Sequence, residues 1–346
     1  NTSAFSVIDV AKQEFVGAVL VDEPDRGAAG IWSIACDDKH IFITHSGTHE
    51  VSVIDHPAML AKFESYKDKS RLDYDLNFLY GLRERVTLQG NGPRNFIFSG
   101  DKLIIPTYFA DILNTVDINT LEVTATDMNP GRTETPENKG EKYFNDANHC
   151  YQGWQSCNGC HPGDARTDGM NWDLMNDGVG NSKNCKSMLF SHMTPPNMIS
   201  GIREHAERAV RAGFNFIQFF EVSEEDAACV DAYLKSLRPV PSPYLVNGEL
   251  SDLAKEGQKV FEKLKCGECH SGVYYTDMKY HRIGEDIEFE KGWDTPTLRE
   301  VWRTAPYLFD GRAATMKEVF SVHKHGIEKK VSEKDIEALT EYVNSL

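Results

Sequence analysis

The chain has 346 residues, of which 40% are hydrophobic, and its 53 acidic and 37 basic side chains give a formal net charge of −16. This length predicts two or three domains with cores of ordinary size. The acidic charge argues against nucleic acid and anionic membrane surfaces as partners. Because the sequence contains no run of about 18 apolar residues, it predicts no membrane span.

The first 135 residues are predicted to form an all-β domain. Residues 5–9, 51–55 and 113–117 share the pattern of a strand that ends in Asp, and paired strand-like segments precede two of them. Strands joined by tight turns are typical of β-propeller blades, and these segments resemble the YVTN type of propeller repeat. Residues 58–86 interrupt the pattern with an insert that we expect to be partly helical.

About two blades and a remnant fit into this region, whereas a closed propeller needs about four or more. We therefore expect a partial propeller, with further blades upstream of Asn1 or on a second polypeptide. A small sheet that packs on the rest of the chain is the alternative. Four histidines of this region are predicted to lie on the surface: His40, His45, His49 and His56.

The pattern Cys-x-x-Cys-His occurs twice, at residues 157–161 and 266–270. In this pattern the two thiols form thioethers to a c-type haem and the histidine ligates its iron. A structural zinc site needs a second Cys/His pair nearby, and a redox-active pair does not need the histidine. We therefore predict two c-type haems, which implies assembly in the periplasm or elsewhere outside the cytoplasm. The predicted attachment residues are Cys157, Cys160, His161, Cys266, Cys269 and His270.

An internal repeat relates the two motifs. Residues 222–237 and 331–346 are similar, and each begins with a Ser-x-x-Asp sequence that is typical of a helix N-terminus. The two serines lie 109 residues apart, as do the two haem motifs. The predicted fold is multidomain, with an all-β partial propeller at 1–135 followed by two mainly α, cytochrome c-like lobes at 140–240 and 245–346, joined by a Pro-rich segment.

The segment ahead of the last helix usually supplies the sixth iron ligand of a small cytochrome. In the second lobe this segment contains His323 and His325, and either is a candidate ligand. Phe214 and Phe216 stand at the corresponding positions of the first lobe and cannot bind iron. The first iron is therefore predicted to be five-coordinate, water-bound or ligated from elsewhere. The candidates for such a ligand are His192, for which a structural hydrogen-bonded role is the alternative, and the weaker His205 and His149.

Residues 294–320 (DTPTLREVWRTAPYLFDGRAATMKEVF) resemble the bacterial di-haem cytochrome c peroxidase family, which includes the methylamine-utilisation di-haem enzymes. The resemblance covers about residues 146–346. It implies a six-coordinate C-terminal haem that receives electrons from a small redox protein, such as a cytochrome c or a cupredoxin. It also implies an N-terminal haem at which peroxide or another oxidant reacts. Phe309 stands where the family usually has histidine, and no residue matches the family's acid–base glutamate.

Three other interpretations stay open. In the first, the chain is an electron-transfer cytochrome with two six-coordinate haems. In the second, it is an enzyme that oxidises a protein side chain, and in the third it is a binding protein whose β part docks a partner. Without the family's glutamate, another group must supply the proton transfer that assists cleavage of an O–O bond. The candidates are Glu207, Gln218 and Glu221, and Trp172 is the candidate for an electron relay, with core packing as its alternative role.

Further candidates concern cofactor contacts and cysteine pairing. Arginine guanidinium groups suit haem propionates, and the resemblance favours Arg299 and Arg312 over Arg203 and Arg166. Family members often bind calcium between the lobes, for which the candidates are Asn176, Asn181, Thr295 and Pro296. Cys150 and Cys185 flank the first haem motif and are candidates for a disulfide in an oxidising compartment.

Overall fold

A computed structural model describes residues 2–174, 178, 180, 182–283 and 290–346. The chain divides into two compact units, each made of two segments. Unit 1 comprises Asn1–Gly159 and Gln218–Val230, and unit 2 comprises Cys160–Ile217 and Asp231–Leu346. The three predicted domain boundaries stay a prediction. In the part of the chain that the structure describes, no helix is both long and apolar enough to cross a lipid bilayer.

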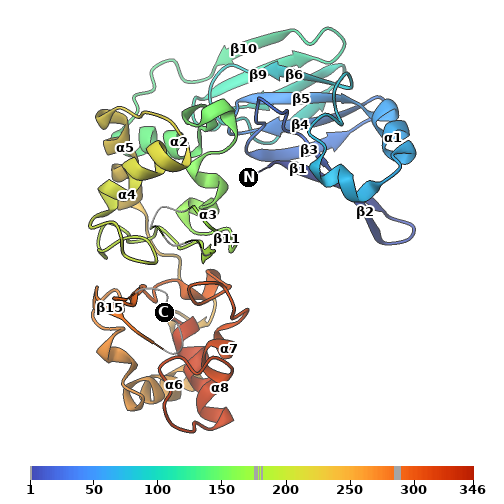
Figure 1. The fold of residues 1–346 in the computed structure, drawn as a ribbon. Helices are drawn as coiled ribbons and strands as arrows, with labels where there is room; N and C mark the ends of the chain where they lie inside the picture. The colour runs from blue at the N-terminus through green and yellow to red at the C-terminus, as the bar shows by residue number, and fades with distance from the viewer. Residues whose placement is uncertain (1, 175–177, 179, 181, 284–289) are drawn as a thin grey trace. The chain divides into compact units, whose positions relative to one another are not determined.

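Unit 1 contains a β-hairpin and two four-stranded antiparallel sheets, coloured blue to cyan in Figure 1. Neighbours in the sequence are neighbours in each sheet, so both sheets are simple meanders. The hairpin consists of β1 (Ala4–Asp9) and β2 (Glu14–Leu20). The first sheet consists of β3 (Ile31–Cys36), β4 (His40–His45), β5 (Glu50–Asp55) and β6 (Arg83–Thr87), and the second of β7 (Ile97–Ser99), β8 (Lys102–Pro106), β9 (Ile112–Asp117) and β10 (Val123–Asp127).

These strands agree with the sequence pattern, because the three predicted Asp-ended segments are β1, β5 and β9. The predicted insert is helical in part and forms α1 (His56–Ser65) and the 3₁₀ helix η1 (Lys69–Tyr74) before the chain re-enters the sheet as β6. Apolar side chains of both sheets share one core, in which Phe42 and Leu103 are fully buried. The prediction of an all-β region with a partly helical insert is confirmed for this segment.

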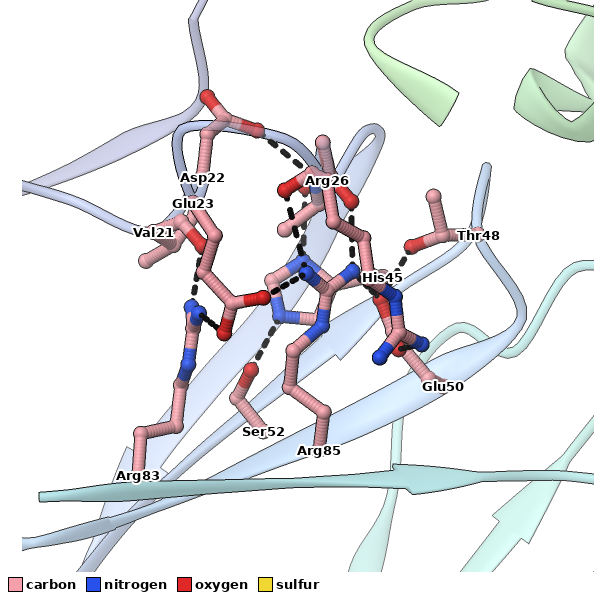
Figure 2. Close-up of polar contacts among 12 residues, drawn as sticks. Val21, Asp22, Glu23, Arg26, His45, Thr48, Glu50, Ser52, Arg83 and Arg85 are labelled. Atoms are coloured by element: carbon pink, nitrogen blue, oxygen red, sulfur yellow. Dashed lines mark hydrogen bonds and ion pairs between the residues drawn. The ribbon is translucent and has the colours of Figure 1, made fainter. Parts of the chain in front are cut away.

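A buried polar cluster lies on one part of the first sheet of unit 1 (Figure 2). His45 and Ser52 are 0% exposed, and the His45 Nε2 lies 2.8 Å from the Ser52 Oγ. Arg85 of β6 pairs with the fully buried Glu50 of β5. The prediction that the histidines of this region lie on the surface is wrong for His45 and for His49, which is 6% exposed, because the sheet and its connections cover them.

The remaining helices and short strands follow β10 in chain order. Unit 1 contains α2 (Pro136–Asn145) and the 3₁₀ helices η2 (Ala147–His149), η3 (Tyr151–Gly153) and η4 (Cys157–Gly159). The first lobe continues with α3 (Pro162–Ala165), β11 (Asn171–Trp172), β12 (Lys183–Asn184), α4 (Ala206–Ala212), the π-helix η5 (Gly213–Ile217) and α5 (Glu224–Ser236). The second lobe contains β13 (Leu245–Val246), β14 (Glu249–Leu250), α6 (Asp252–Lys263), η6 (Cys266–Glu268), β15 (Tyr280–His281), β16 (Trp293–Asp294), η7 (Val301–Arg303), α7 (Met316–Ser321) and α8 (Glu333–Asn344).

The internal repeat is visible in the backbone. The Ser223 and Ser332 hydroxyl groups each accept a hydrogen bond, at 3.1 Å, from the backbone N–H three residues on, so α5 and α8 begin as predicted. Each lobe also has a two-stranded hairpin, β11–β12 or β15–β16, after its haem motif. Near these hairpins the Thr167 hydroxyl donates to the Cys185 carbonyl at 2.6 Å, and Thr276 donates to Thr295 at the same distance. Two lobes of one plan therefore follow the haem motifs.

Helices α6 and α8 form the core of the second lobe. Val260 and Phe261 of α6 pack in one cluster with Leu339 and Val343 of α8. The two helices approach closely at Gly257, where a Cβ atom would lie 1.8 Å from the Ala338 carbonyl oxygen. Glycine is therefore required at this helix crossing, although it lowers intrinsic helix stability by about 1 kcal/mol relative to alanine.

Candidate haem sites

The histidine of the second Cys-x-x-Cys-His motif, His270, lies close to His325, and the planes of the two imidazoles are tilted by 49°. The His270 Nδ1 lies 3.1 Å from the Tyr275 carbonyl oxygen, which can only accept, so Nδ1 carries the proton and Nε2 is left to bind a metal. The ring centroids of His270 and His325 lie 6.3 Å apart. A metal–imidazole bond is about 2 Å long, so two imidazoles on opposite sides of one metal have centroids about 6 Å apart. This pair therefore fits a six-coordinate haem iron.

His325 reaches this position because the chain turns back just after α7, where the His325 N–H donates to the Val319 carbonyl at 3.0 Å. Burial lowers the pKa of His325 to about 4 and also lowers that of His270, so both rings are neutral, as metal binding requires. His323 was the other candidate ligand. The structure brings His325 opposite His270, and the assignment of the sixth ligand to it is a prediction that spectroscopy tests.

The histidine of the first motif makes the same kind of hydrogen bond as the histidine of the second. The His161 Nδ1 lies 3.1 Å from the Arg166 carbonyl, five residues on, just as His270 is related to Tyr275. Burial lowers the pKa of His161 as well. This shared feature fixes the tautomer of both histidines and leaves Nε2 available in each. Both motifs therefore hold a histidine of the form that haem attachment needs.

The cysteines around the first motif are free thiols, so the predicted disulfide between Cys150 and Cys185 is wrong. The Cys185 Sγ instead donates to the Cys160 carbonyl at 3.1 Å and lies 3.5 Å from the His161 Nδ1. Burial raises the pKa of Cys160 to about 11 and that of Cys185 to about 12. Cys185 thus belongs to the surroundings of the first histidine, and proximity to the motif in sequence was the wrong signal for a bridge.

The residues that correspond to His323 and His325 in the first lobe carry no metal ligand. Phe214 is 1% exposed, and Phe216 is 62% exposed. Both lie in the π-helix η5, whereas His325 lies in the irregular segment after α7. The first lobe therefore differs from the second both in side chain and in backbone at the place where the second lobe supplies an imidazole.

His192 is held in a buried ionic cluster. Its Nε2 lies 3.0 Å from the Asp231 Oδ1, and Asp231 also pairs with Arg211. The His192 side chain is 2% exposed, so the structure favours the hydrogen-bonded structural role for it. The two weaker candidates also have neighbours of their own: His205 is 58% exposed beside Glu204, and the His149 ring contacts Tyr143 and Phe220.

The candidate acid–base residues are spread over different environments. Glu207 forms an ion pair with Lys235 at 2.9 Å, and this hydrogen bond lowers the Glu207 pKa below its ordinary value. Glu221 is exposed. Gln218 is 3% exposed and donates from Nε2 to the Cys157 Sγ at 3.1 Å, within unit 1. Trp172 donates to Asp168 at 3.0 Å and is partly buried. Their proposed roles stay predictions.

The candidate propionate-binding arginines differ in how their side chains are engaged. Arg299 donates from Nε to the Val273 carbonyl at 2.9 Å, and Arg312 pairs with Asp310 at 2.7 Å. The Arg203 Nε is buried and has no hydrogen-bond partner among the described residues. Arg203 lines a cavity of about 510 Å³ in unit 2 with two arginines that sequence analysis missed, Arg208 and Arg211. A buried guanidinium nitrogen without a hydrogen-bond partner fits an anionic cofactor substituent such as a propionate.

Arg203 and Arg312 are not equivalent positions of the two lobes. The bridges Asn197–Arg203 and Tyr307–Ala313 are equivalent, so Arg203 corresponds to Ala313. Two of the candidate calcium ligands, Thr295 and Pro296, are adjacent in the chain. The Thr295 carbonyl oxygen already accepts a hydrogen bond from the Thr276 hydroxyl group. Asn176 and Asn181 lie outside the described residues, and the calcium site stays a prediction.

Comparisons with known proteins give relatives but no family model that matches. The chain is 27% identical to hydrazine synthase subunit gamma of Kuenenia stuttgartiensis over 272 residues, which are 60% of this chain and 76% of the relative. It is 22% identical to cytochrome c551 peroxidase of Nitrosomonas europaea over 259 residues, which are 55% of this chain and 75% of the relative.

Solved structures share the fold of part of this chain. A structure of Kuenenia stuttgartiensis hydrazine synthase superposes with a TM-score of 0.55 and 23% identity, covering 62% of this chain and 89% of that one. A MauG-like protein associated with microbial copper homeostasis gives a TM-score of 0.50 and 17% identity, covering 64% and 91%. The relatives named by sequence are oxidoreductases, which bears out the prediction of an enzyme and of haem as cofactor. These homologues support the di-haem cytochrome peroxidase-like family, the one that residues 294–320 resemble.

Proposed function

We propose that the chain is a di-haem oxidoreductase with two unequal iron sites. His270 and His325 would hold the C-terminal haem iron, which would receive electrons, and His161 would hold the N-terminal haem iron, which would supply the chemistry of peroxide reduction. The observation that carries this proposal is the pair of imidazoles in the second lobe, whose ring centroids lie 6.3 Å apart, whereas Phe214 and Phe216 stand at the corresponding positions of the first lobe.

The side chains divide the work between the two sites. When bound, haem supplies the redox chemistry. His270 and His325 would both hold the iron of the second haem, which would leave it without a free ligand position. In the first lobe, the Asp231 carboxylate holds the His192 Nε2, so this nitrogen is already engaged within the protein. The first site therefore offers a position at which a small oxidant can bind.

The proposed function also includes a compartment, an electron donor and a fold for the β part of the chain. Thioether attachment of haem implies a compartment outside the cytoplasm, and a small redox protein such as a cytochrome c or a cupredoxin is the proposed electron donor. The two four-stranded meanders of unit 1 have the strand connectivity of propeller blades, so we propose a partial propeller for this unit.

A second candidate function rests on Glu207. Its ion pair with Lys235 lowers its pKa, so it is ionised at neutral pH and is not a ready proton donor for O–O cleavage. The relative with the higher identity is a subunit of a larger enzyme. In this second candidate function, the chain is a haem subunit of a larger assembly and does not reduce peroxide by itself. Steady turnover of hydrogen peroxide by the isolated chain with a reduced cytochrome c supports the first function, and no turnover supports the second.

Electron paramagnetic resonance of the oxidised protein tests the inequality of the two sites. We expect one high-spin and one low-spin ferric signal in equal amounts. The His325→Ala variant should convert the low-spin signal to high spin, because it removes one strong-field ligand.

The matched control is His323→Ala, which lies two residues away and should leave the low-spin signal in place. Two low-spin signals in the wild-type protein would contradict an open first site. A low-spin signal that persists in His325→Ala but disappears in His323→Ala would assign the ligand to His323 instead.

A further inference from the structure

Arg166 and Glu300 form a buried ion pair between segments 134 residues apart. The Arg166 Nε donates to Oε2 at 2.6 Å and Nη2 donates to Oε1 at 3.1 Å, so the pairing is bidentate. The two side chains are only 3% and 1% exposed. A bidentate pairing fixes the relative orientation of the two side chains. Removing one partner is costly, because it leaves an uncompensated buried charge.

The backbone of Arg166 is the hydrogen-bond partner of the first axial histidine. Its carbonyl accepts the His161 Nδ1–H at 3.1 Å. The guanidinium of the same residue also donates from Nη1 to the Asp164 carbonyl, which closes the short turn between His161 and Arg166. The ion pair with Glu300 therefore fixes the residue whose carbonyl orients the His161 ring.

The pair also holds the joint between the two lobes. The Arg166 Nη2 donates to the Arg238 carbonyl at 2.9 Å, and the Val240 N–H donates to the Glu300 Oε1. Three parts of unit 2 thus meet at two side chains: the turn after the first haem motif, the joint after α5, and the second lobe.

Each residue of this ion pair has a counterpart in the opposite lobe, and both counterparts are aromatic. Tyr275 corresponds to Arg166, because its carbonyl accepts the His270 proton. Phe190 lies 110 residues before Glu300, and both have positive φ angles, of 61° and 60°. The ring of Phe190 contacts Tyr274, the neighbour of Tyr275, with centroids 5.0 Å apart. The contacts between the lobes are therefore reciprocal, with an ionic contact at His161 and an aromatic one at His270. Lys186 and Asp294 form a further ion pair between the lobes at 2.6 Å.

We infer that Arg166 and Glu300 are positioning residues for His161. A hydrogen bond from Nδ1–H increases the basicity of the opposite nitrogen toward a metal. By fixing the Arg166 carbonyl, the ion pair sets the donor strength of the His161 Nε2 and ties it to the arrangement of the second lobe. The inference deepens the proposed function, on which it rests, because it concerns the site at which the oxidant is proposed to react.

Potentiometric titration and electron paramagnetic resonance of the haem-loaded full chain test the inference. In Glu300→Gln, we expect the reduction potential of the first haem to rise, because a less basic axial nitrogen stabilises the ferric state less. Its ferric signal should change shape, while the potential and the signal of the second haem stay as in the wild type. The double variant Arg166→Met/Glu300→Leu removes both charges, so no buried charge is left alone, and it should shift the first haem in the same direction.

The matched control is Tyr280→Phe, which removes the 2.7 Å hydrogen bond from the Tyr280 hydroxyl to the Gly201 carbonyl, also between the two lobes. This variant should leave both haems unchanged. If Glu300→Gln does not fold, the double variant decides. An unchanged first haem in the folded double variant, or equal shifts of both haems, would overturn the inference. Each haem is compared with its own wild-type signal, so a low-spin first haem, which would defeat the proposed function, still permits this test.

Discussion

The imidazole of His45 shows how burial and two hydrogen bonds fix a protonation state. Its Nδ1 lies 2.9 Å from the Ala28 carbonyl, which can only accept, and its Nε2 lies 2.8 Å from the Ser52 hydroxyl, which must then donate. A second proton on the ring would remove the acceptor for Ser52 and place a charge in the sheet. Burial accordingly lowers the pKa of His45 to about 4.

This lowered pKa predicts a loss of stability in acid. The unfolded chain binds a proton at His45 below about pH 6.5, whereas the folded chain does so only below about pH 4. The unfolded state therefore binds more protons between these values, and stability falls as the pH falls. The contribution of His45 should be about 3 kcal/mol between pH 7 and pH 4.

Denaturant unfolding of the full chain at several pH values measures this contribution. We expect the His45→Gln variant to show a shallower decline of stability from pH 7 to pH 4 than the wild type. The control is His205→Gln, which alters a 58% exposed histidine and should keep the wild-type slope. Equal slopes for His45→Gln and the wild type would contradict the assignment.

The sequence could identify the two Cys-x-x-Cys-His motifs but not the residues that support their histidines. Cys157, Cys160 and His161 lie within five positions, so their relation is local and the spacing reveals it. Arg166 and Glu300 are far apart in the chain. Arg166 was a candidate only for a haem propionate, and Glu300 lies in the family-like stretch 294–320 without an assigned role. Their pairing depends on how the two lobes pack, and the same tertiary dependence explains why the burial of His45 was missed.

Secondary-structure elements show a similar division. Helices α5 and α8 were predictable because their capping serines and apolar spacing are local signals. The β strands were predictable from alternation and turns. The π-helix η5 was not predicted; its sequence, GFNFI, differs at every position from VHKHG, the corresponding segment of the second lobe. The close contact between α6 and α8 also depends on a residue, Gly257, that in sequence only weakens a helix.

The contact between α6 and α8 gives a prediction at the level of elements. In Gly257→Ala, the new methyl group would overlap the backbone carbonyl of Ala338, so α6 and α8 must move apart. We expect a loss of about 3 kcal/mol, at the upper end of the usual range for overpacking. Urea unfolding followed by circular dichroism measures it.

A control for this variant is Gly131→Ala, because nothing lies within 4 Å of a Cβ atom at that position. It should change the free energy of unfolding by less than about 0.5 kcal/mol. If both alanine variants behave alike, the close packing of α6 on α8 does not determine the stability of the second lobe.

At the level of the whole molecule, the formal net charge of −16 bears on the electron donor. A strongly acidic protein attracts basic partners over a distance that salt shortens, from about 30 Å at 0.01 M to about 8 Å at 0.15 M ionic strength. We propose that the donor is a small basic redox protein, and we expect its second-order rate constant to fall at least about tenfold over this range.

Stopped-flow reduction of the oxidised chain by a basic cytochrome c measures this dependence. An acidic cupredoxin serves as the control and should react faster, not slower, as salt is added. A rate with the basic donor that does not change with ionic strength would exclude electrostatic attraction as the basis of the encounter.

The reciprocal contacts between the lobes restrict how such a chain can be divided or recombined. The Glu300 carboxylate, 1% exposed, depends on the Arg166 guanidinium supplied by the other lobe. A fragment with only one lobe would contain one member of this ion pair without the other. A chimera built from two relatives would need to inherit both members of the ionic contact or neither. The two haem modules resemble each other in plan, yet they are not interchangeable parts.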